Sequence, residues 1–361
     1  MSDRLPIYYF ANQVYQYSFA KAVYQRLGGT FLVRYRHRKW RFQWYLRKSQ
    51  REKFSLPGFD SLPAVRVHPD HKRPLPDPGL YLSNSNSRLH VSHPESKTIF
   101  MGHGTGDKPY GGDEKNLLTY DYHFIAGPKH LEKLRDSRLE IPEEKCIPIG
   151  NPRFDEYVNG TIDRKAYRRY LGIRDTERKT VLYAPTWEWG NGTLHQLVKP
   201  LIRELTPEYN LIVRPHYFDR KYIYRYRLWA ERRGFQHVYW SNPANILTND
   251  TMYDFALSDC LISDTSSILY EYLITRNPII VIENQYTGGH HMPPEMDIHS
   301  IARHVDLATA RRVRSVLDAS WTNHSRADYE ALLSNCFYFN DGKSVDRVVE
   351  FCQTLRWPQS G

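Results

Sequence analysis

Residues Leu257–Asn284 read LSDCLISDTSSILYEYLITRNPIIVIEN, and this stretch decides the fold. Its apolar runs at Cys260–Ser263 and Ile279–Ile282 are short and nearly continuous, as in the buried strands of a parallel sheet. Between them, Ile268–Ile274 carries apolar residues at helical spacing, and Pro278 marks where that helix has ended. The stretch therefore predicts a strand, a helix and a second strand parallel to the first.

The turn between the first strand and the helix consists of Asp264, Thr265, Ser266 and Ser267. All four belong to residue types whose side-chain oxygens cap helices. Backbone N–H groups, hydroxyls and the positive end of the helix dipole would converge there, which suits a phosphate or a diphosphate. An ordinary capped helix of an α/β domain has the same pattern, so both interpretations stay open from this stretch alone.

The composition is that of a soluble globular protein. Of the 361 residues, 40% are hydrophobic and 25% are charged, which predicts two domains or one large domain. The formal charge is +10, and the segment from Arg4 to Arg51 contains no Asp or Glu. A basic surface of this kind predicts an anionic partner, namely nucleic acid, anionic lipid or a phosphate-rich substrate.

The four cysteines lie far apart in the chain and form no CxxC pair. This spacing fits neither a disulfide framework nor a zinc site, and it predicts buried thiols in a reducing compartment. The first residues lack the apolar core of a signal peptide, and no window approaches 18 uninterrupted apolar residues. We therefore expect a cytoplasmic protein without a membrane-spanning helix.

The segment Arg34–Lys48 interleaves most of its cations with aromatic side chains, and Trp40 and Trp44 lie one helical turn apart. One interpretation is an amphipathic helix that lies on an anionic membrane. A second is a surface on which the bases of single-stranded nucleic acid stack. A third is a solvated helix whose rings pack on their own domain.

The alternation of strands and helices starts twice along the chain. Leu5–Val33 predicts a strand, a helix and a parallel strand, and the pattern restarts at Val181–Ala184 after the charged segment Thr161–Lys179. We expect one domain at 1–160 and a second at 161–361, with the last helix free to pack back on the first domain. Polar residues follow the strands, where open α/β sheets bind ligands, so a cleft between the domains is the expected site.

Five motifs at such positions carry a resemblance to a known family. They are His103-Gly104-Thr105-Gly106-Asp107-Lys108, Gly150-Asn151-Pro152-Arg153-Phe154-Asp155, Tyr183-Ala184-Pro185-Thr186-Trp187-Glu188, Arg214-Pro215-His216, and Ser263-Asp264-Thr265-Ser266-Ser267 with Glu271. In this order they resemble the HGTPLK, G-x-P-R-x-D, YAPTWR, K-P-H and sDYSSv-fDf motifs of the CDP-glycerol glycerophosphotransferase family. These enzymes are the polymerases and primases of teichoic acids and related capsule polymers. The resemblance implies a GT-B fold of two Rossmann-like, doubly wound parallel-sheet domains that face each other across a cleft.

The resemblance also implies an activity and a set of site residues. A polyol phosphate, glycerol or ribitol phosphate, would pass from a CDP-activated donor to a hydroxyl of a teichoic-acid-like or capsule acceptor, with release of CMP. His103 would be the general base and Lys108 a charge stabiliser. The donor would be bound by Arg214, His216, Asp264, Thr265, Ser266, Ser267 and Glu271, in a cleft that also includes Gly104, Thr105, Arg153 and Thr186.

The expected partners follow from the same resemblance. They are the CDP-polyol donor, a lipid-linked or oligomeric polyol-phosphate or glycan acceptor, and an anionic membrane surface on the inner face of the cell membrane, with no nucleic acid. The sequence contains no dense carboxylate cluster that would indicate a metal site, and we expect no bound cofactor.

The motifs depart from the family pattern at several positions. Gly106 stands where the family has Pro, Asp107 where it has an apolar residue, Arg214 for Lys, Thr265 for Tyr, and Glu188 where Arg is common. The departures leave the donor head-group open among CDP-glycerol, CDP-ribitol and another activated polyol or sugar. Two other classes stay open as well: a GT-B glycosyltransferase that uses a nucleotide sugar, and a nucleic-acid-binding protein.

Overall fold

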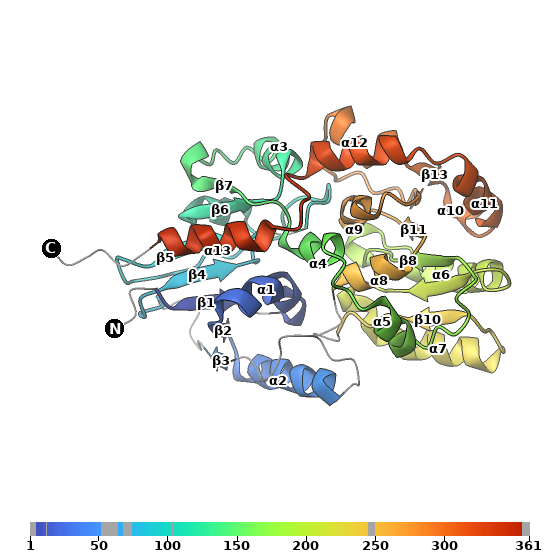
Figure 1. Cartoon of the computed structure of the whole chain (residues 1–361), viewed down its shortest axis with the longest axis horizontal. Coiled ribbons are helices and arrows are strands. Elements are labelled where there is room, and N and C mark those ends of the chain that lie inside the picture. The colour runs from blue at the N-terminus through green and yellow to red at the C-terminus, as the bar shows by residue number, and fades with distance from the viewer. Residues whose placement is uncertain are drawn as a thin grey trace.

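The computed structural model describes residues 5–11, 13–51, 64–67, 74–102, 104–244 and 250–355, with the side chains of 14, 15, 45, 46 and 48–51 left out. It contains two sheets, each built from parallel strands and flanked by helices, which lie side by side along the long axis of the molecule (Figure 1). The predicted architecture of two doubly wound α/β domains is therefore confirmed.

The first sheet has the strand order β3-β2-β1-β4-β5-β6-β7. Its strands are β1 (Ile7–Phe10), β2 (Thr30–Val33), β3 (Ala64–Val67), β4 (Leu80–Ser83), β5 (Lys97–Phe100), β6 (Tyr122–Ile125) and β7 (Cys146–Pro148). On β1, Tyr9 is opposite Phe31 on one side and Leu82 on the other. The chain order reverses at β1, so the switch point of the sheet lies between β1 and β4, and the helices of this half are α1 (Val14–Leu27), α2 (Arg36–Arg51) and α3 (Pro128–Asp136).

The second sheet has the order β10-β9-β8-β11-β12-β13. Its strands are β8 (Thr180–Tyr183), β9 (Asn210–Val213), β10 (Val238–Trp240), β11 (Cys260–Ser263), β12 (Ile279–Ile282) and β13 (Arg303–Val305). The α-helices after β7 are α4 (Asp155–Val158), α5 (Arg164–Leu171), α6 (Leu194–Leu205), α7 (Ile223–Arg232), α8 (Thr251–Leu257), α9 (Ile268–Glu271), α10 (Leu307–Ala310), α11 (Arg314–Thr322), α12 (Arg326–Cys336) and α13 (Ser344–Thr354). Short 3-10 helices cover Glu114–Thr119, Glu143–Lys145, Pro152–Phe154, Glu188–Gly190, Tyr217–Tyr222, Tyr272–Thr275, Pro294–Met296 and Ile298–Ser300.

The stretch that decides the fold forms the middle of the second sheet. Strands β11 and β12 pair in parallel and are buried along their whole length, as their uninterrupted apolar runs predict. The helix between them differs from the prediction, because α9 is a single α-turn that continues as the 3-10 helix Tyr272–Thr275. So short an α-helix has a small dipole, and any anion binding at its start must come mainly from individual polar groups.

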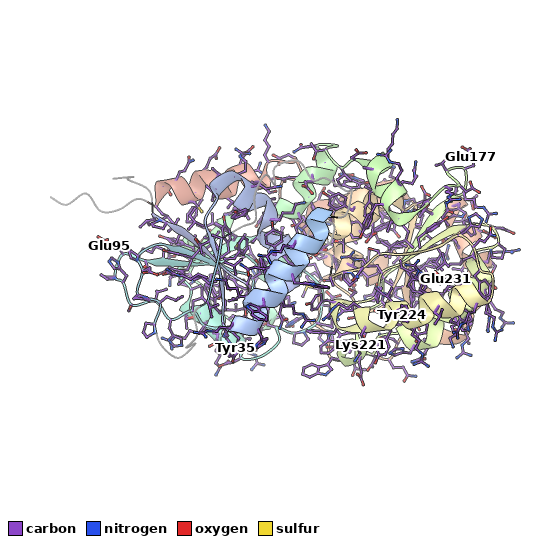
Figure 2. All side chains as sticks on the ribbon, turned by 90° about the horizontal axis from the view of Figure 1, so that it is seen from below. Tyr35, Glu95, Glu177, Lys221, Tyr224 and Glu231 are labelled. Carbon is purple, nitrogen blue, oxygen red and sulfur yellow. The ribbon has the colours of Figure 1, made fainter. Side chains whose placement is uncertain are left out.

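The basic segment forms α2, which lies on the outer surface of the first domain and crosses the face shown in Figure 2, with Tyr35 beside its first turn. Phe42 is 1% exposed and packs between Tyr17 and Phe31. Trp40 and Trp44 are 78% and 56% exposed. The prediction that the rings pack on their own domain is therefore confirmed for Phe42, whereas more than half of each of the two tryptophans is exposed.

The end of the chain returns from the second domain to the first. After α12, the backbone N–H of Tyr338 donates to the carbonyl of Ala126 over 2.9 Å, and α13 then lies beside α1 (Figure 1). Phe351 on α13 packs edge-on against Tyr122. The carboxylate of Asp155 accepts the first two N–H groups of α13, at 3.1 and 2.7 Å, and so caps this helix.

The crossing at Gly127 makes a testable stability prediction. A Cβ at this residue would collide with the backbone of Cys336 and Phe337, where neither neighbour can rotate away. We expect Gly127→Ala to lower the free energy of unfolding by about 1–3 kcal/mol, the usual cost of overpacking, seen as a lower thermal midpoint. Gly111→Ala is the matched control, since a Cβ there meets no atom within 4 Å. Equal midpoints for the two variants would contradict this reading of the crossing.

Candidate active site

A cleft of about 670 Å³ lies between the two domains. Its walls come from the loops that follow β5, β8, β9 and β11, at the carboxyl ends of the strands, as the sequence predicts. Nine of the predicted site residues line it: Gly104, Lys108, Arg153, Thr186, Arg214, His216, Ser266, Ser267 and Glu271. Residues from five separate motifs are thereby brought to one place.

The remaining predicted residues have other positions. His103 lies outside the described residues, between Gly102 and Gly104 on the loop after β5. Thr105 is buried behind that loop and faces a small cavity of about 30 Å³ that also reaches His130. Burial lowers the pKa of His130 to about 3, so this histidine is neutral under ordinary conditions.

The loop after β5 touches the turn after β11 directly. A Cβ at Gly104 would lie 2.6 Å from Ser267 Oγ, and a Cβ at Gly106 would lie 2.7 Å from Ser267 Cα. Lys108 on the same loop donates a hydrogen bond to Thr186 Oγ1 of the second domain. Burial lowers the pKa of Lys108. The two glycines thus allow the first domain to close onto the predicted phosphate-binding turn.

Asp264 and Thr265, which were predicted to bind the donor, do not line the cleft. Asp264 is fully buried and accepts hydrogen bonds from the N–H groups of Thr186 and Thr193 at 2.7 and 3.0 Å. Burial raises its pKa to about 6, against the opposing effect of those hydrogen bonds. Thr265 donates to the carbonyl of Gly190 over 2.7 Å. Both side chains therefore hold the 186–193 loop in place, and Ser266 and Ser267 alone present the turn to the cleft.

Arg153 joins the two domains through a buried ion cluster. Its guanidinium lies 2.9 Å from Asp250 Oδ1 and 2.8 Å from Glu271 Oε2. Burial by itself would lower the pKa of Arg153, but the two carboxylates raise it above its ordinary value. Because the charge of Glu271 is already compensated by Arg153, its predicted role in binding the donor stays a prediction.

The loop after β9 contributes Arg214 and His216. Arg214 Nη1 lies 2.9 Å from both Asp254 Oδ2 and Ser241 Oγ, so a buried carboxylate fixes the position of this guanidinium. His216 stacks on Trp187 with ring centroids 5.7 Å apart, and its Nδ1 accepts the N–H of Phe218 at 3.3 Å. An Nδ1 that accepts a hydrogen bond places the proton of neutral histidine on Nε2.

Sequence reasoning missed two residues of helix α3. Lys129 and Lys133 are one helical turn apart, and both turn toward the loop that carries His103. Lys129 Nζ lies 2.5 Å from Asp107 Oδ1, and Tyr270 donates to Asp107 Oδ2 over 2.8 Å. The signal was present in the sequence, because a lysine pair at i and i+4 follows the predicted strand Tyr122–Ala126. It was hidden by the assumption that charged helix residues are solvated.

One group of side chains in the described part of the chain has the spacing of a metal site. Ligand atoms of Asp107, Asp297 and His299 lie within 4.8 Å of one another. Lys129 and Tyr270 already engage both oxygens of Asp107, so its charge is compensated without a metal ion. Transfer without a metal therefore stays a prediction at this point.

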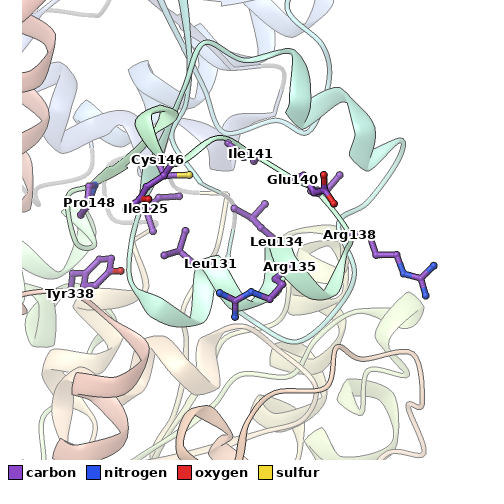
Figure 3. Close-up of a pocket in the computed structure, with 12 residues that line it drawn as sticks. Ile125, Leu131, Leu134, Arg135, Arg138, Glu140, Ile141, Cys146, Pro148 and Tyr338 are labelled. Atoms are coloured by element: carbon purple, nitrogen blue, oxygen red, sulfur yellow. The ribbon is translucent and has the colours of Figure 1, made fainter.

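A second, largely apolar cavity of about 710 Å³ opens on the opposite side of α3 (Figure 3). Leu131, Leu134 and Tyr338 line it, with Arg135 and Arg138 at its edge. None of the predicted site residues lines this cavity. The positions of the motif residues therefore indicate that the interdomain cleft is the functional site, although the other cavity is slightly larger.

The contact between the loop and the turn makes a prediction that a double mutant can test. Gly104→Ala would meet only side-chain atoms of Ser267, whereas Gly106→Ala would also meet its Cα and N atoms. We expect each substitution to lower the thermal midpoint, with a cost of about 1–3 kcal/mol. Ser267→Gly should restore Gly104→Ala and leave Gly106→Ala impaired. Equal rescue of both variants would contradict the described contact.

Comparison with known proteins places these motifs in a family. Residues 82–353 match the family model of CDP-glycerol:poly(glycerophosphate) glycerophosphotransferase. The teichoic acid poly(glycerol phosphate) polymerase of Staphylococcus epidermidis is 26% identical over 227 residues, which cover 55% of this chain and 30% of that protein. The teichoic acid ribitol-phosphate primase of Bacillus spizizenii is 26% identical over 271 residues, which cover 71% of this chain and 66% of that protein. The chain thus spans less than two thirds of the length of either relative.

Solved structures agree with the fold. The wall teichoic acid polymerase TagF superposes with a TM-score of 0.68 at 17% identity, over 98% of this chain and 89% of that chain. The UDP-GlcNAc 2-epimerase of Neisseria meningitidis, bound to UDP-GlcNAc, superposes with a TM-score of 0.58 at 13% identity, over 97% of this chain and 100% of that chain. These likenesses show a GT-B-like fold. Because the family model matches most of the chain, motifs included, the chain belongs to the CDP-glycerol:poly(glycerophosphate) glycerophosphotransferase family.

Proposed function

We propose that this chain transfers a polyol phosphate, glycerol or ribitol phosphate, from a CDP-activated donor to a hydroxyl of a teichoic-acid-like or capsule acceptor and releases CMP. The observation that carries the proposal is the contact between the loop of His103 and the Ser266–Ser267 turn in one cleft. A base from one domain and a phosphate site from the other would meet there. Membership of the family supports the same reaction.

The donor diphosphate binds on the second-domain side of the cleft. Ser266 and Ser267 offer hydroxyls, and the imidazole of His216 lines the same cleft. Arg214 adds positive charge from a position that Asp254 holds rigid. Rigid donors stabilise the charge that develops on a diphosphate at little reorganisation cost. The stack of Trp187 on His216 fixes the imidazole plane in the same way.

The acceptor hydroxyl approaches from the first-domain side. His103 removes its proton, since a histidine pKa of about 6.5 suits reversible proton transfer near neutrality. The oxygen then attacks the β-phosphorus of the donor, a phosphodiester forms, and the bond to CMP breaks. Lys108 neutralises part of the negative charge that grows on the leaving phosphate. Protein cations supply the neutralisation in this scheme, with no metal ion required.

The released nucleotide tests the proposed reaction. The chain is incubated with CDP-glycerol, CDP-ribitol and a panel of nucleotide sugars, together with a short polyol-phosphate acceptor. Release of CMP with phosphodiester formation is the expected result. Release of a nucleoside diphosphate would instead identify a glycosyltransferase, which attacks carbon and leaves the diphosphate intact. Steeply salt-dependent binding of DNA or RNA, with no turnover of any donor, would favour the nucleic-acid-binding alternative.

The proposed base makes a separate kinetic prediction. His103→Ala should lower turnover by about 10²–10⁴-fold, the usual contribution of a general base. Affinity for the CDP donor, measured by titration, should change little because the base acts on the acceptor. His103→Asn keeps hydrogen bonding without basicity and should be equally impaired. Near-normal turnover of His103→Ala would exclude this role, and Asp107 is then a poor substitute since Lys129 and Tyr270 occupy its carboxylate.

We also propose that α2 carries the protein to an anionic membrane surface, where a lipid-linked acceptor would be located. No helix in the described ranges is long and apolar enough to cross a bilayer. Trp40 and Trp44 project from the same face region one turn apart, among cations that include Arg36, Arg41 and Arg47. Exposed indoles with flanking cations are typical of helices that lie in the membrane interface.

Liposome sedimentation tests this docking. Each cation near an anionic surface contributes roughly 1 kcal/mol, so replacing Arg36, Arg38 and Lys39 by Glu should abolish binding to anionic vesicles. Replacing Trp40 and Trp44 by Ser should weaken binding while leaving the fold intact, because both rings are exposed. Neutral vesicles and a variant with Glu at Arg225, Arg227 and Arg232 on α7 are the controls. Unchanged binding of the α2 variants to anionic vesicles would refute the proposal.

A further inference from the structure

Lys133 is a buried cation in the wall of the cleft. It lies on α3, is 5% exposed, and its Nζ donates to the carbonyl of Gly106 over 2.8 Å. The same ammonium sits 4.5 Å from the centroid of the Tyr110 ring. The next residue of the helix, Leu134, faces the other cavity (Figure 3). Helix α3 therefore separates the two cavities, with Lys133 directed to the side of the interdomain cleft.

Other strongly buried cations near the cleft have a carboxylate partner. Lys129 is paired with Asp107, Arg153 with Asp250 and Glu271, and Arg214 with Asp254. Within the described part of the chain, no carboxylate oxygen lies within the 4.0 Å ion-pair distance of Lys133 Nζ. The nearby acid, Asp107, is turned to Lys129. Lys133 is thus the member of this set that lacks a counter-charge.

Burying an ammonium without a counter-charge is unfavourable, and its surroundings favour the neutral form of Lys133. Burial lowers the pKa of Lys133 to about 7, and the neighbouring charges of Lys108 and Lys129 lower it as well, while Asp107 and Glu114 act in the opposite direction. A methionine would fill the same space without desolvating a charge. The hydrogen bond to Gly106 and the contact with the Tyr110 ring supply no counter-charge, whereas an anion in the cleft would.

We propose that Lys133, together with Lys108, forms a phosphate-binding subsite on the first-domain side of the cleft, so that a substrate phosphate supplies the missing counter-charge. The subsite deepens the proposed transfer reaction and rests on it. The ligand class is a phosphate oxyanion, either the donor diphosphate or a phosphodiester of the acceptor chain. Both lysines line the cleft beside the loop of His103, where the acceptor hydroxyl and the donor phosphorus must meet.

The subsite has a consequence for protons. An anion next to Lys133 raises the pKa of its ammonium, so ligand binding takes up a proton wherever the free side chain is largely neutral. With a free pKa of about 7, uptake is expected at about pH 8 and disappears below about pH 6. The groups around Lys133 are Asp107, Lys108, Tyr110 and Glu114 from the segment 107–114, and Lys129 and His130 on α3 itself. Among these, Lys133 alone has a pKa placed at about 7.

Calorimetric titration in buffers of different ionisation enthalpy measures this uptake. CDP-glycerol and CDP-ribitol are the probes of choice, because their diphosphate is a diester and does not titrate near neutrality. At about pH 8 the unsubstituted protein should take up close to one proton more than Lys133→Met. The variant should also bind about ten- to a hundredfold more weakly, the range expected for a lost charge-assisted hydrogen bond. Lys115→Met removes an exposed cation close by and is the matched control.

Two arms distinguish the source of the phosphate. Weaker binding of the CDP-polyol alone assigns the subsite to the donor, and weaker binding of a glycerol-phosphate dimer alone assigns it to the acceptor. Unchanged affinity for both ligands and unchanged proton uptake in Lys133→Met would overturn the subsite. Should Lys133→Met fail to fold, Lys133→Arg replaces it. If the unsubstituted protein takes up no proton at about pH 8 with either the CDP-polyol or the glycerol-phosphate dimer, the subsite is overturned as well. An unsubstituted protein that releases no CMP contradicts the proposed reaction instead, so the two failures are distinguishable.

Discussion

The buried ion cluster of Arg153 with Asp250 and Glu271 is the interaction on which the cleft depends. It joins the motif that ends the first domain to two segments of the second, and all three side chains are buried. Leaving either carboxylate without Arg153 would expose an uncompensated charge to a low-dielectric interior, a loss of about 3–5 kcal/mol in comparable buried pairs. The cluster therefore sets the relation between the domains, and with it the approach of the His103 loop to Ser267.

The cations of the cleft differ in whether they are paired with a buried carboxylate. Arg153 and Arg214 each have a buried carboxylate, which fixes their position and also reduces the charge they present to a ligand. Within the described part of the chain, the hydrogen bond of Lys108 goes to the hydroxyl of Thr186 and that of Lys133 to a backbone carbonyl. The net positive charge that can act on a phosphate thus comes mainly from the first-domain side. This asymmetry suits a reaction in which charge develops between a donor held by one domain and an acceptor held by the other.

The sequence predicted the elements well because each depends on local pattern. Strands β11 and β12 follow from their apolar runs, and the polar residues after strands had to meet at one edge of parallel sheets. The sequence could not predict the direction in which individual side chains point. Asp264 and Thr265 turn away from the cleft because the backbone of the 186–193 loop, 71 to 78 residues earlier, offers them partners. The lysine pair on α3 was visible in the sequence, but the missing counter-charge of Lys133 was not, since it depends on where Asp107 finds its own partner.

The two departures at residues 106 and 107 form one structural unit with the lysines of α3. Gly106 allows the loop to meet the backbone of Ser267, and its carbonyl accepts the ammonium of Lys133. Asp107 takes Lys129 as its counter-charge and reaches Tyr270 in the second domain. An apolar residue at 107, as the family motif has, would leave Lys129 buried without an acid. The acid at 107 therefore compensates the first lysine and not the second, so the loop departs from the family pattern in a way that leaves Lys133 for an external anion.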